Sequence, residues 1–562
     1  MKIMQKIKSL KQAELRKRME AVKLGIPEKG ESMDKLIRLT ELPLTDLQAK
    51  IKDKAITPLE LLHAFQLKAI QLYEKGNSGI CEFIQEAEQQ ASQLTENPPA
   101  EKSELFGIPI SIKELCCVRG YDATFGLWKY CNQPSEEDCV VVQVLKRAGA
   151  VPFVLTATSQ LAFTTSGFNP VFGDMKNPYS DKHEPGGSSN GEAVLLAQNG
   201  SPVGIGSDIA GSIRIPCTLC GLTGLKPTTG RISTVGSKVM APQTTVAIKI
   251  CIGPMGKRVD DLVKVMRTLL SPSMYELDPT LPVLPFNESM YTGTDKRNLV
   301  IGYYDTIDDP DIIQTVPSVR RVVRQAVRIL SERGHRLVQF SPPKPLRAME
   351  LGIRSCGADG GQALADALKD EQLNEFSKTI KQIVSVPYTL TSVADTLLRK
   401  FIGKPAAVCK LSRRFRKVTD LLSHLQHWEN YGREFAKAWK ETEDLDALIC
   451  PGWAYPAQNI ETPPHFITPS VIYTLLFNVV DYPAGAVPMG KVTVEDLDQA
   501  KEAAEQFKQS GDAYHEQLML MQADTSGLPL GVQVVAKPFR EELVLRIMAE
   551  LEAGGLQPND TQ

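Results

Sequence analysis

The 562-residue sequence contains no long apolar run. A membrane-spanning helix needs about 18 or more such residues in a row, so none is predicted. The N-terminal segment MKIMQKIKSLKQAELRKRME lacks the continuous apolar core of a signal peptide. A strong charge of either sign is also missing, because the formal net charge is −2 at pH 7. We therefore expect no general attraction to nucleic acid and no nucleic-acid partner.

The eleven cysteines show no pairing pattern, and the seven histidines show no metal-ligand spacing. An odd number of scattered cysteines favours a reducing, intracellular compartment over a disulfide framework. Cys217 and Cys220 form one C-x-x-C in an apolar stretch, which is more typical of small core residues than of zinc or redox chemistry. His424 and His427 stand beside Leu and Trp, so we expect a packed or surface pair. No metal and no organic cofactor are predicted.

Strand and helix patterns alternate along the chain, without an internal repeat or a long flexible linker. This alternation predicts one large α/β domain, here residues 31–562. It is preceded by a basic amphipathic segment, residues 1–30, which we expect to form a solvated helical arm docked on the domain. The expected helices are 1–24, 57–75, 82–95, 136–148, 318–333, 432–441 and 540–552, and the expected strands are 107–113, 150–155, 447–452 and 527–537.

The first segment that could do chemistry is Gly107-Ile-Pro-Ile-Ser-Ile-Lys113. Its isoleucines alternate, so Lys113 ends an apolar strand and points to the opposite face. A lysine at this position is either a surface charge at the rim of the sheet or a partly desolvated amine. In the second case its pKa is low enough for it to act as a base.

The second segment is PGGSSNGE at 185–192, where Ser189 occupies the serine of a G-x-S-x-G motif. In α/β-hydrolases that motif joins a buried strand to a helix, and its serine is the nucleophile. Residues 192–197 fit the helix. Residues 177–185 contain two prolines and several turn-forming residues, which predict a loop instead of the strand. The context that the motif requires is therefore incomplete.

The third segment is GIGSDIAGSIRIP at 204–216, in which small residues surround Ser212. Such a segment can be a tight turn between a strand and a helix. Alternatively, its successive backbone N–H groups can converge on one point and form an oxyanion hole.

Considered together, the three segments resemble the amidase signature family. The resemblance runs from about residue 50 to about residue 552 and is strongest to the fatty acid amide hydrolase branch. It implies a single α/β domain with a central mixed twisted β-sheet flanked by many helices. The stretches that carry it are GGSSNGE at 186–192, GSDIAGSIRIP at 206–216, CGLTGLKPT at 220–228, and the branch-like GIPISIKE, YELDPTLPVLPF and YTLLFNVVDYPAGAVP.

The resemblance implies a serine hydrolase that cleaves long-chain fatty acid amides, such as N-acylethanolamines, through an acyl-enzyme. Ser212 would be the nucleophile, and Ser188 would pass its proton to Lys113. Further implied roles fall into three groups: the oxyanion hole would be the N–H groups of Ile209, Ala210, Gly211 and Ser212, the substrate would contact Ala162, Phe163 and Ser188, and Ser189, Asp208 and Arg214 would hold the loops.

Two residues depart from the family pattern, because Ala210 and Asn190 stand where glycines are usual. An alanine is strained if its position requires a positive φ, whereas an asparagine tolerates the left-handed region. A non-catalytic relative therefore stays open as an alternative. Two others are a monoacylglycerol esterase with the same triad and the glutaminase subunit of a tRNA amidotransferase.

Residues 379–417 combine an apolar stretch with a basic one, and no acid lies between Asp395 and Asp420. The pattern predicts either a buried helix followed by a solvated basic helix or a monotopic cap on an anionic membrane surface. The resemblance implies the cap, a homodimer, and a peripheral location on the cytoplasmic face of endomembranes. It also aligns the first residues of this chain with the end of the branch's N-terminal anchor, so we expect that anchor to be absent.

Overall fold

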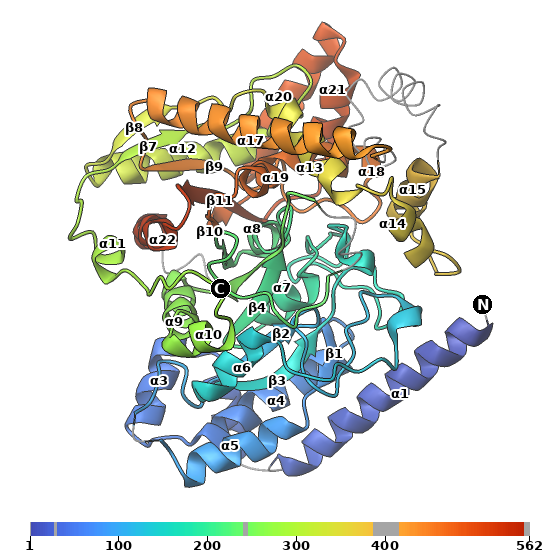
Figure 1. The fold of residues 1–562 in the computed structure, drawn as a ribbon, viewed down its shortest axis with the longest axis vertical. Coiled ribbons are helices and arrows are strands. Elements are labelled where there is room, and N and C mark those ends of the chain that lie inside the picture. Colours follow the sequence, from blue (N-terminus) through green and yellow to red (C-terminus); the bar gives the residue numbers. More distant parts are fainter. Residues whose placement is uncertain (1, 27–30, 100, 240–245, 386–414, 556–562) are drawn as a thin grey trace.

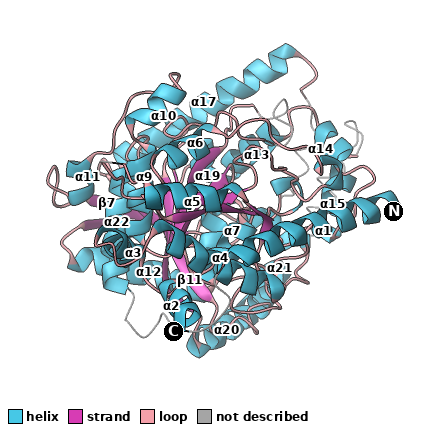
Figure 2. Ribbon diagram, turned by 90° about the horizontal axis from the view of Figure 1, so that it is seen from below, coloured by secondary structure: helices cyan, strands magenta, loops and turns pink. Residues whose placement is uncertain are grey.

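The structure, a computed structural model, describes residues 2–26, 31–99, 101–239, 246–385 and 415–555. In these residues an eleven-stranded mixed sheet has the order β1-β3-β2-β4-β6-β5-β10-β11-β9-β7-β8. Figure 2 shows the strands in the interior with helices around them, which confirms the predicted α/β domain. The strands are β1 (Ile80–Phe83), β2 (Pro109–Lys113), β3 (Val151–Thr156), β4 (Val203–Asp208), β5 (Thr223–Lys226), β6 (Cys251–Gly256), β7 (Val300–Tyr303), β8 (Arg336–Gln339), β9 (Ala447–Pro451), β10 (Ala484–Lys491) and β11 (Pro529–Ala536).

Helices from the N-terminal and the C-terminal halves of the chain surround the sheet (Figure 1). They are α1 (Lys2–Gly25), α2 (Glu31–Leu39), α3 (Leu44–Lys52), α4 (Pro58–Glu74), α5 (Glu86–Glu96), α6 (Val140–Arg147), α7 (Asn190–Ala197), α8 (Arg214–Cys220), α9 (Val259–Leu269), α10 (Pro272–Leu277), α11 (Glu288–Thr292), α12 (Pro317–Glu332), α13 (Pro345–Cys356), α14 (Gln362–Ala367), α15 (Glu375–Val384), α17 (Val418–Glu441), α18 (Pro464–Ser470), α19 (Ile472–Val479), α20 (Val494–Ser510), α21 (Ala513–Leu520) and α22 (Glu541–Gly555).

All expected strands exist, and most of the expected helices end within a few residues of their predicted bounds. The helix expected at 82–95 is wrong at its start, because residues 82 and 83 belong to β1 and the helix is α5. The helix expected at 432–441 is the last part of the longer α17. Sequence patterns indicated four of the eleven described strands, and one of those they did not indicate is β10, which contains glycines and a proline. It is a strand because it pairs with β5 and β11 on its two sides.

The N-terminal arm is the helix α1 (Lys2–Gly25), which runs along the lower right side of the molecule in Figure 1. It is docked on the domain through charges as well as apolar contacts. Nζ of Lys11, only 3% exposed, lies 2.6 Å from Glu82 and 2.8 Å from Asp122. Arg18 adds a second ion pair to Glu82 at 2.7 Å. Part of the charge of this helix is therefore buried in its contact with the domain.

Two neighbouring parallel strands position the site. In β2 and β4, Ser111 pairs with Gly204 and Ile112 with Ile205, and both strands are buried along their whole length. The carboxyl ends of parallel strands meet at one edge of a sheet, where α/β proteins commonly bind ligands. Lys113 ends β2 and Asp208 ends β4, so the first and third candidate segments meet at this edge.

The cysteine and histidine interpretations agree with the described residues. Cys217 and Cys220 are buried free thiols in α8, so they are core residues. The side chain of His424 is buried and shares a hydrogen bond of 2.8 Å with Ser355, as expected of a packed histidine.

Most of the segment 379–417 lies outside the described residues, which here end at residue 385 in the turn after α15 and resume at 415. Among the helices that are described, none combines the length and hydropathy needed to cross a membrane.

Candidate active site

Lys113 is completely buried at the end of β2 and faces the serine loop. Its Nζ donates to Oγ of Ser189 at 2.8 Å, to Oγ of Ser188 at 3.1 Å and to the carbonyl of Ser207 at 3.4 Å. Burial lowers the pKa of Lys113 from its ordinary 10.5 to about 7. The alternative of a surface charge at the rim is therefore wrong. The side chain is an amine that can be neutral near pH 7.

Three buried carboxylates lie near this lysine: Asp208 at the end of β4, and also Glu114 and Glu192. Glu114 accepts hydrogen bonds from the backbone and hydroxyl groups of Thr124 and Thr158. Glu192, in the first turn of α7, accepts from the hydroxyls of Ser111 and Thr156, the latter at 2.6 Å. Burial raises the pKa of Glu192 to about 7. All three carboxylates oppose the effect of burial on the Lys113 pKa, because negative charge stabilises the ammonium form.

The serine loop leads directly into α7, and its Gly187–Ser188 peptide bond is cis. Residues 177–189, all described, form turns, bends and isolated β-bridges and contain none of the named strands. The strand that the G-x-S-x-G motif requires is thus missing, as expected. The backbone N–H of Ser189 donates to the carbonyl of Ser212 at 3.1 Å, which joins the two serine segments. Ser189 was expected only to hold the loops, yet it also contacts Lys113.

The buried pair of Asp208 and Arg214 holds the second serine segment. The guanidinium donates to both carboxylate oxygens, from Nε at 3.1 Å and from the second terminal nitrogen at 3.0 Å. The same carboxylate accepts from the backbone N–H of Gly211 at 2.8 Å and of Ile213 at 3.1 Å. Although burial favours the neutral acid, Arg214 holds the pKa of Asp208 well below its ordinary value. The turn that carries Ser212 is therefore fixed by one ionised carboxylate.

Three residues that the sequence patterns did not single out complete this network. The hydroxyl of Thr474 donates to the carbonyl of Ala210 at 2.7 Å, and Asn478 donates to Asp208 at 3.0 Å. Arg214 in turn donates to the side-chain oxygen of Gln533 at 3.1 Å. Thr474 and Asn478 are four residues apart in the apolar helix α19, so they share one face. Two polar residues on one face of an otherwise apolar helix are the sequence feature that could have identified Thr474 and Asn478 as partners of a buried polar site.

The oxyanion prediction changes at one position. The N–H of Gly211 donates to Asp208 and is not free to bind an oxyanion. In the part of the chain that the structure describes, the N–H groups of Ile209, Ala210 and Ser212 have no hydrogen-bond acceptor. Ala210 is not among the residues with positive φ, whereas Gly211 has φ 125°. The strain considered for Ala210 is therefore absent, and its N–H remains a possible donor.

Ser212 lies beside an apolar cavity of about 100 Å³. The expected substrate contacts Ala162 and Phe163 line this cavity. The third expected contact, Ser188, is not among the lining residues, although the preceding Gly187 is. Among the described residues no hydrogen bond joins the hydroxyls of Ser188 and Ser212. The remaining lining residues are Thr164, Thr165, Ile209, Ala210, Ile215, Ile353, Cys356, Phe376, Ile380, Ile467, Val471 and Leu475.

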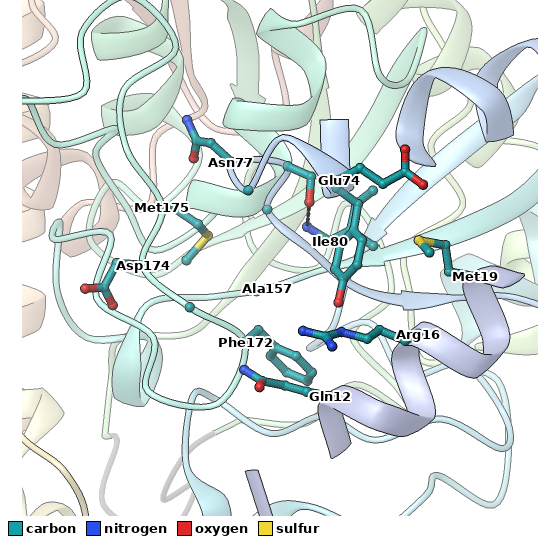
Figure 3. A pocket seen from close by; sticks show the side chains of 15 residues that line it. Gln12, Arg16, Met19, Glu74, Asn77, Ile80, Ala157, Phe172, Asp174 and Met175 are labelled. Carbon is teal, nitrogen blue, oxygen red and sulfur yellow. Dashed lines mark hydrogen bonds between the residues drawn. The ribbon is translucent and has the colours of Figure 1, made fainter. Parts of the chain in front are cut away.

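A second cavity, of about 380 Å³, lies between α1 and the body of the domain (Figure 3). Figure 3 shows Arg16 and Met19 entering it from α1, with Phe172 and Asp174 on other sides. Its lining is polar and apolar in mixture and includes none of the candidate catalytic residues. The cavity beside Ser212, although smaller, is therefore the one that belongs to the site.

Comparison with known proteins agrees with this geometry. The profile of the family described as Amidase matches residues 60–545. Fatty-acid amide hydrolase 1 of Sus scrofa is 37% identical over 93% of this chain and 87% of its own length. Fatty acid amide hydrolase 1 of Caenorhabditis elegans is 33% identical over 91% of this chain and 88% of its own.

A solved structure of a fatty acid amide hydrolase superposes with a TM-score of 0.76, covering 99% of this chain and 97% of that one. At a sequence identity of 22%, this superposition is evidence for a shared fold alone. The profile match and the two relatives together show that this chain belongs to the amidase signature family.

Proposed function

We propose that this protein hydrolyses the amide bond of long-chain fatty acid amides through an acyl-enzyme on Ser212. The observation that carries the proposal is the buried Lys113, bonded to Ser188, at the edge of the sheet where Ser212 borders an apolar cavity. The fatty-acid amide hydrolases among its relatives support amide hydrolysis as the reaction class.

The first step is proton transfer away from the nucleophile. A serine hydroxyl is almost entirely un-ionised at neutral pH and needs an adjacent base. Neutral Lys113 would take the proton of Ser212 through the hydroxyl of Ser188. The Ser188–Ser212 hydrogen bond of this relay would form in the substrate complex, since catalytic hydrogen bonds often tighten only there. The Ser212 oxygen then bonds to the carbonyl carbon, and the oxyanion accepts from the free N–H groups of the 209–212 turn.

The second step expels the amine. Amine nitrogen is a poor leaving group until it is protonated, and Lys113, now an ammonium, would return the proton through Ser188. The C–N bond breaks and leaves an ester between the acyl group and Ser212. Water, activated by the same relay, hydrolyses this ester to a free fatty acid. Each donor in the oxyanion hole typically contributes ~3–4 kcal/mol to lowering the barrier.

The apolar cavity favours an acyl chain over a polar substrate. Fatty acyl esters, such as monoacylglycerols, are the second candidate, because the acyl group and the nucleophile are the same. A glutaminase subunit is the third candidate. Its substrate is small and polar, and the five isoleucines, one leucine and two phenylalanines around the cavity do not offer polar contacts for it. Ammonia release from glutamine by the purified protein would favour this third candidate.

The test is turnover of oleoyl amide and oleoyl glycerol ester by the wild type and by Ser212→Ala. We expect the wild type to cleave the amide and the variant to cleave neither substrate. Equal activity of both proteins would exclude Ser212 as nucleophile. Labelling by a fluorophosphonate distinguishes our proposal from the α/β-hydrolase alternative. The α/β-hydrolase motif predicts that Ser189 is labelled, whereas our proposal predicts that Ser212 is labelled.

We further propose that the protein binds membranes peripherally, on the cytoplasmic face of endomembranes, and that it forms a homodimer. The basic and apolar pattern of 379–417 supports the membrane contact. Helix α15, which overlaps the start of this segment, contributes Phe376 and Ile380 to the lining of the acyl cavity. Sedimentation with anionic liposomes should therefore carry the wild type down. Variants with charged residues at Phe401 and Ile402 should stay in solution, and equal sedimentation would refute the cap. Analytical ultracentrifugation tests the dimer.

A further inference from the structure

Asn190 is the first residue of α7 and follows the two serines directly. Its side chain is completely buried and bonded at both ends of the amide. The nitrogen donates to the carbonyl of Ser166 at 2.9 Å, and the oxygen accepts from the backbone N–H of Ser159 at 2.7 Å. One side chain therefore connects the serine loop to both ends of the segment 159–166.

The segment 159–166 forms one wall of the acyl cavity. It contributes Ala162, Phe163, Thr164 and Thr165 to the lining. Its backbone is held in a costly conformation, because the consecutive residues Leu161 and Ala162 have φ of 67° and 52°, in the left-handed region. Such a conformation persists only where surrounding contacts determine it. The amide of Asn190 supplies two of these contacts.

The same amide lies against the backbone that carries Ser188. A Cβ built on Gly187 would lie 2.9 Å from the side-chain nitrogen of Asn190 and 2.5 Å from the carbonyl of Thr164. The cavity wall and the serine loop thus touch with no space between them, and Asn190 stands at their junction. A displacement of the wall would change the cavity beside the reacting groups.

We propose that Asn190 is a positioning residue that determines acyl-chain specificity. Its amide holds the 159–166 wall against the serine loop and thereby fixes the width of the acyl cavity next to Ser212. The inference rests on the proposed function, since it concerns where the acyl chain binds. Long chains touch more of the wall than short chains, so loss of the amide should affect them more.

The experiment measures kcat and KM for octanoyl, myristoyl and oleoyl amides with the wild type, Asn190→Gly and Asn190→Asp. We expect Asn190→Gly to reduce the preference for oleoyl over octanoyl amide about tenfold, mainly through KM. Asn190→Asp keeps the acceptor for Ser159 and loses the donor to Ser166, so its profile should be intermediate. An unchanged chain-length profile in Asn190→Gly would overturn the proposal.

The matched control is Asn177→Gly. Asn177 is also buried and bonds backbone groups of Tyr179, Glu184 and Leu219, none of which lines the cavity. This variant should lose thermal stability and keep the wild-type chain-length profile. A similar change of profile in both variants would show that Asn190 has only a general structural role.

Amide hydrogen exchange of residues 159–166 measures how firmly the cavity wall is held, independently of substrate turnover. Exchange should be faster in Asn190→Gly than in the wild type and intermediate in Asn190→Asp, and equal exchange in all three proteins would overturn the proposal. If the wild type cleaves no fatty acyl amide or ester and Ser212 takes no fluorophosphonate, the proposed function fails. The exchange result then still decides whether Asn190 holds the wall.

Discussion

Nζ of Lys113 lies 3.1 Å from Oγ of Ser188 in a site where the lysine is wholly removed from solvent. Because burial lowers its pKa to about 7, the amine is a base at the pH at which the serine must be activated. We predict that kcat/KM rises with pH and is half-maximal near pH 7, as the neutral fraction of Lys113 grows. A pH–rate profile on a fatty amide measures this, and an inflection near 10 would contradict it.

The same pKa predicts a pH dependence of stability. Between pH 7 and 10.5 the unfolded chain holds a proton on Lys113 that the folded chain lacks, so the free energy of unfolding rises with pH across this window. In Lys113→Met this rise is removed. The difference in melting temperature, wild type minus variant, should therefore increase from pH 7 to pH 10, and a constant difference would show that the lysine pKa is not depressed.

Glu192 should raise the pKa of Lys113. Its carboxylate is buried near Lys113 and favours the ammonium form, which raises the pKa of the lysine against the effect of burial. Glu192→Gln removes the charge and keeps a side chain that can accept from one of the two hydroxyls of Ser111 and Thr156 and donate to the other. We expect the acid limb of the pH–rate profile to move to lower pH. A shift to higher pH would exclude this role.

The ion pair between Asp208 and Arg214 should be needed for both stability and catalysis. Asp208→Asn leaves the buried guanidinium uncompensated, which typically costs about 3–5 kcal/mol of unfolding free energy. It also weakens the acceptor for the N–H groups of Gly211 and Ile213, so kcat should fall as well. Denaturant unfolding and turnover measure the two effects.

Glu443→Gln is the control for this prediction. It removes an Arg–carboxylate pair with Arg336, whose two side chains are 68% and 43% exposed. Exposed pairs contribute about 0–1 kcal/mol, so this variant should behave almost like the wild type. An equally small effect of Asp208→Asn would mean that the buried pair does not fix the turn.

Lys11 should anchor the N-terminal helix. Lys11→Met leaves Glu82 and Asp122 as buried carboxylates that have lost one cation, and we expect a loss of about 3–5 kcal/mol. Lys23→Met, which breaks a half-exposed pair of the same helix with Glu74, should cost about 0–1 kcal/mol. Chemical denaturation compares the two. Equal stability of the variants would refute the anchoring role of Lys11.

The segments that carry Lys113, Ser188 and Ser212 were visible in the sequence because each stands in a distinctive local pattern. Alternating isoleucines before Lys113 indicate a strand end, and the glycine-rich surroundings of Ser188 and Ser212 indicate turns with exposed backbone groups. The family resemblance then related these segments to one another. Periodicity also predicted the N-terminal helix, since its apolar stripe recurs within a few residues.

Hydrogen-bond partners, in contrast, were not predictable. Asp208 receives its bonds from Gly211 nearby and from Asn478, which is 270 residues away, and Thr474 reaches Ala210 across 264 residues. The removal of the Gly211 N–H from the predicted oxyanion hole and the proposed role of Asn190 follow from such contacts. Strand β10 is likewise a consequence of its neighbours β5 and β11, because its own residues have a weak preference for a strand.

Local patterns in the sequence indicated the fold class and the ends of most of the helices that we expected. The candidate catalytic side chains, in contrast, came from the resemblance to the amidase signature family. Only the folded chain shows that Lys113 is buried, which of the described N–H groups at the site are free, and what encloses the apolar cavity beside Ser212. The reason is physical: a pKa and a hydrogen-bond partner are properties of an environment, and segments far apart in the chain assemble that environment only when it folds.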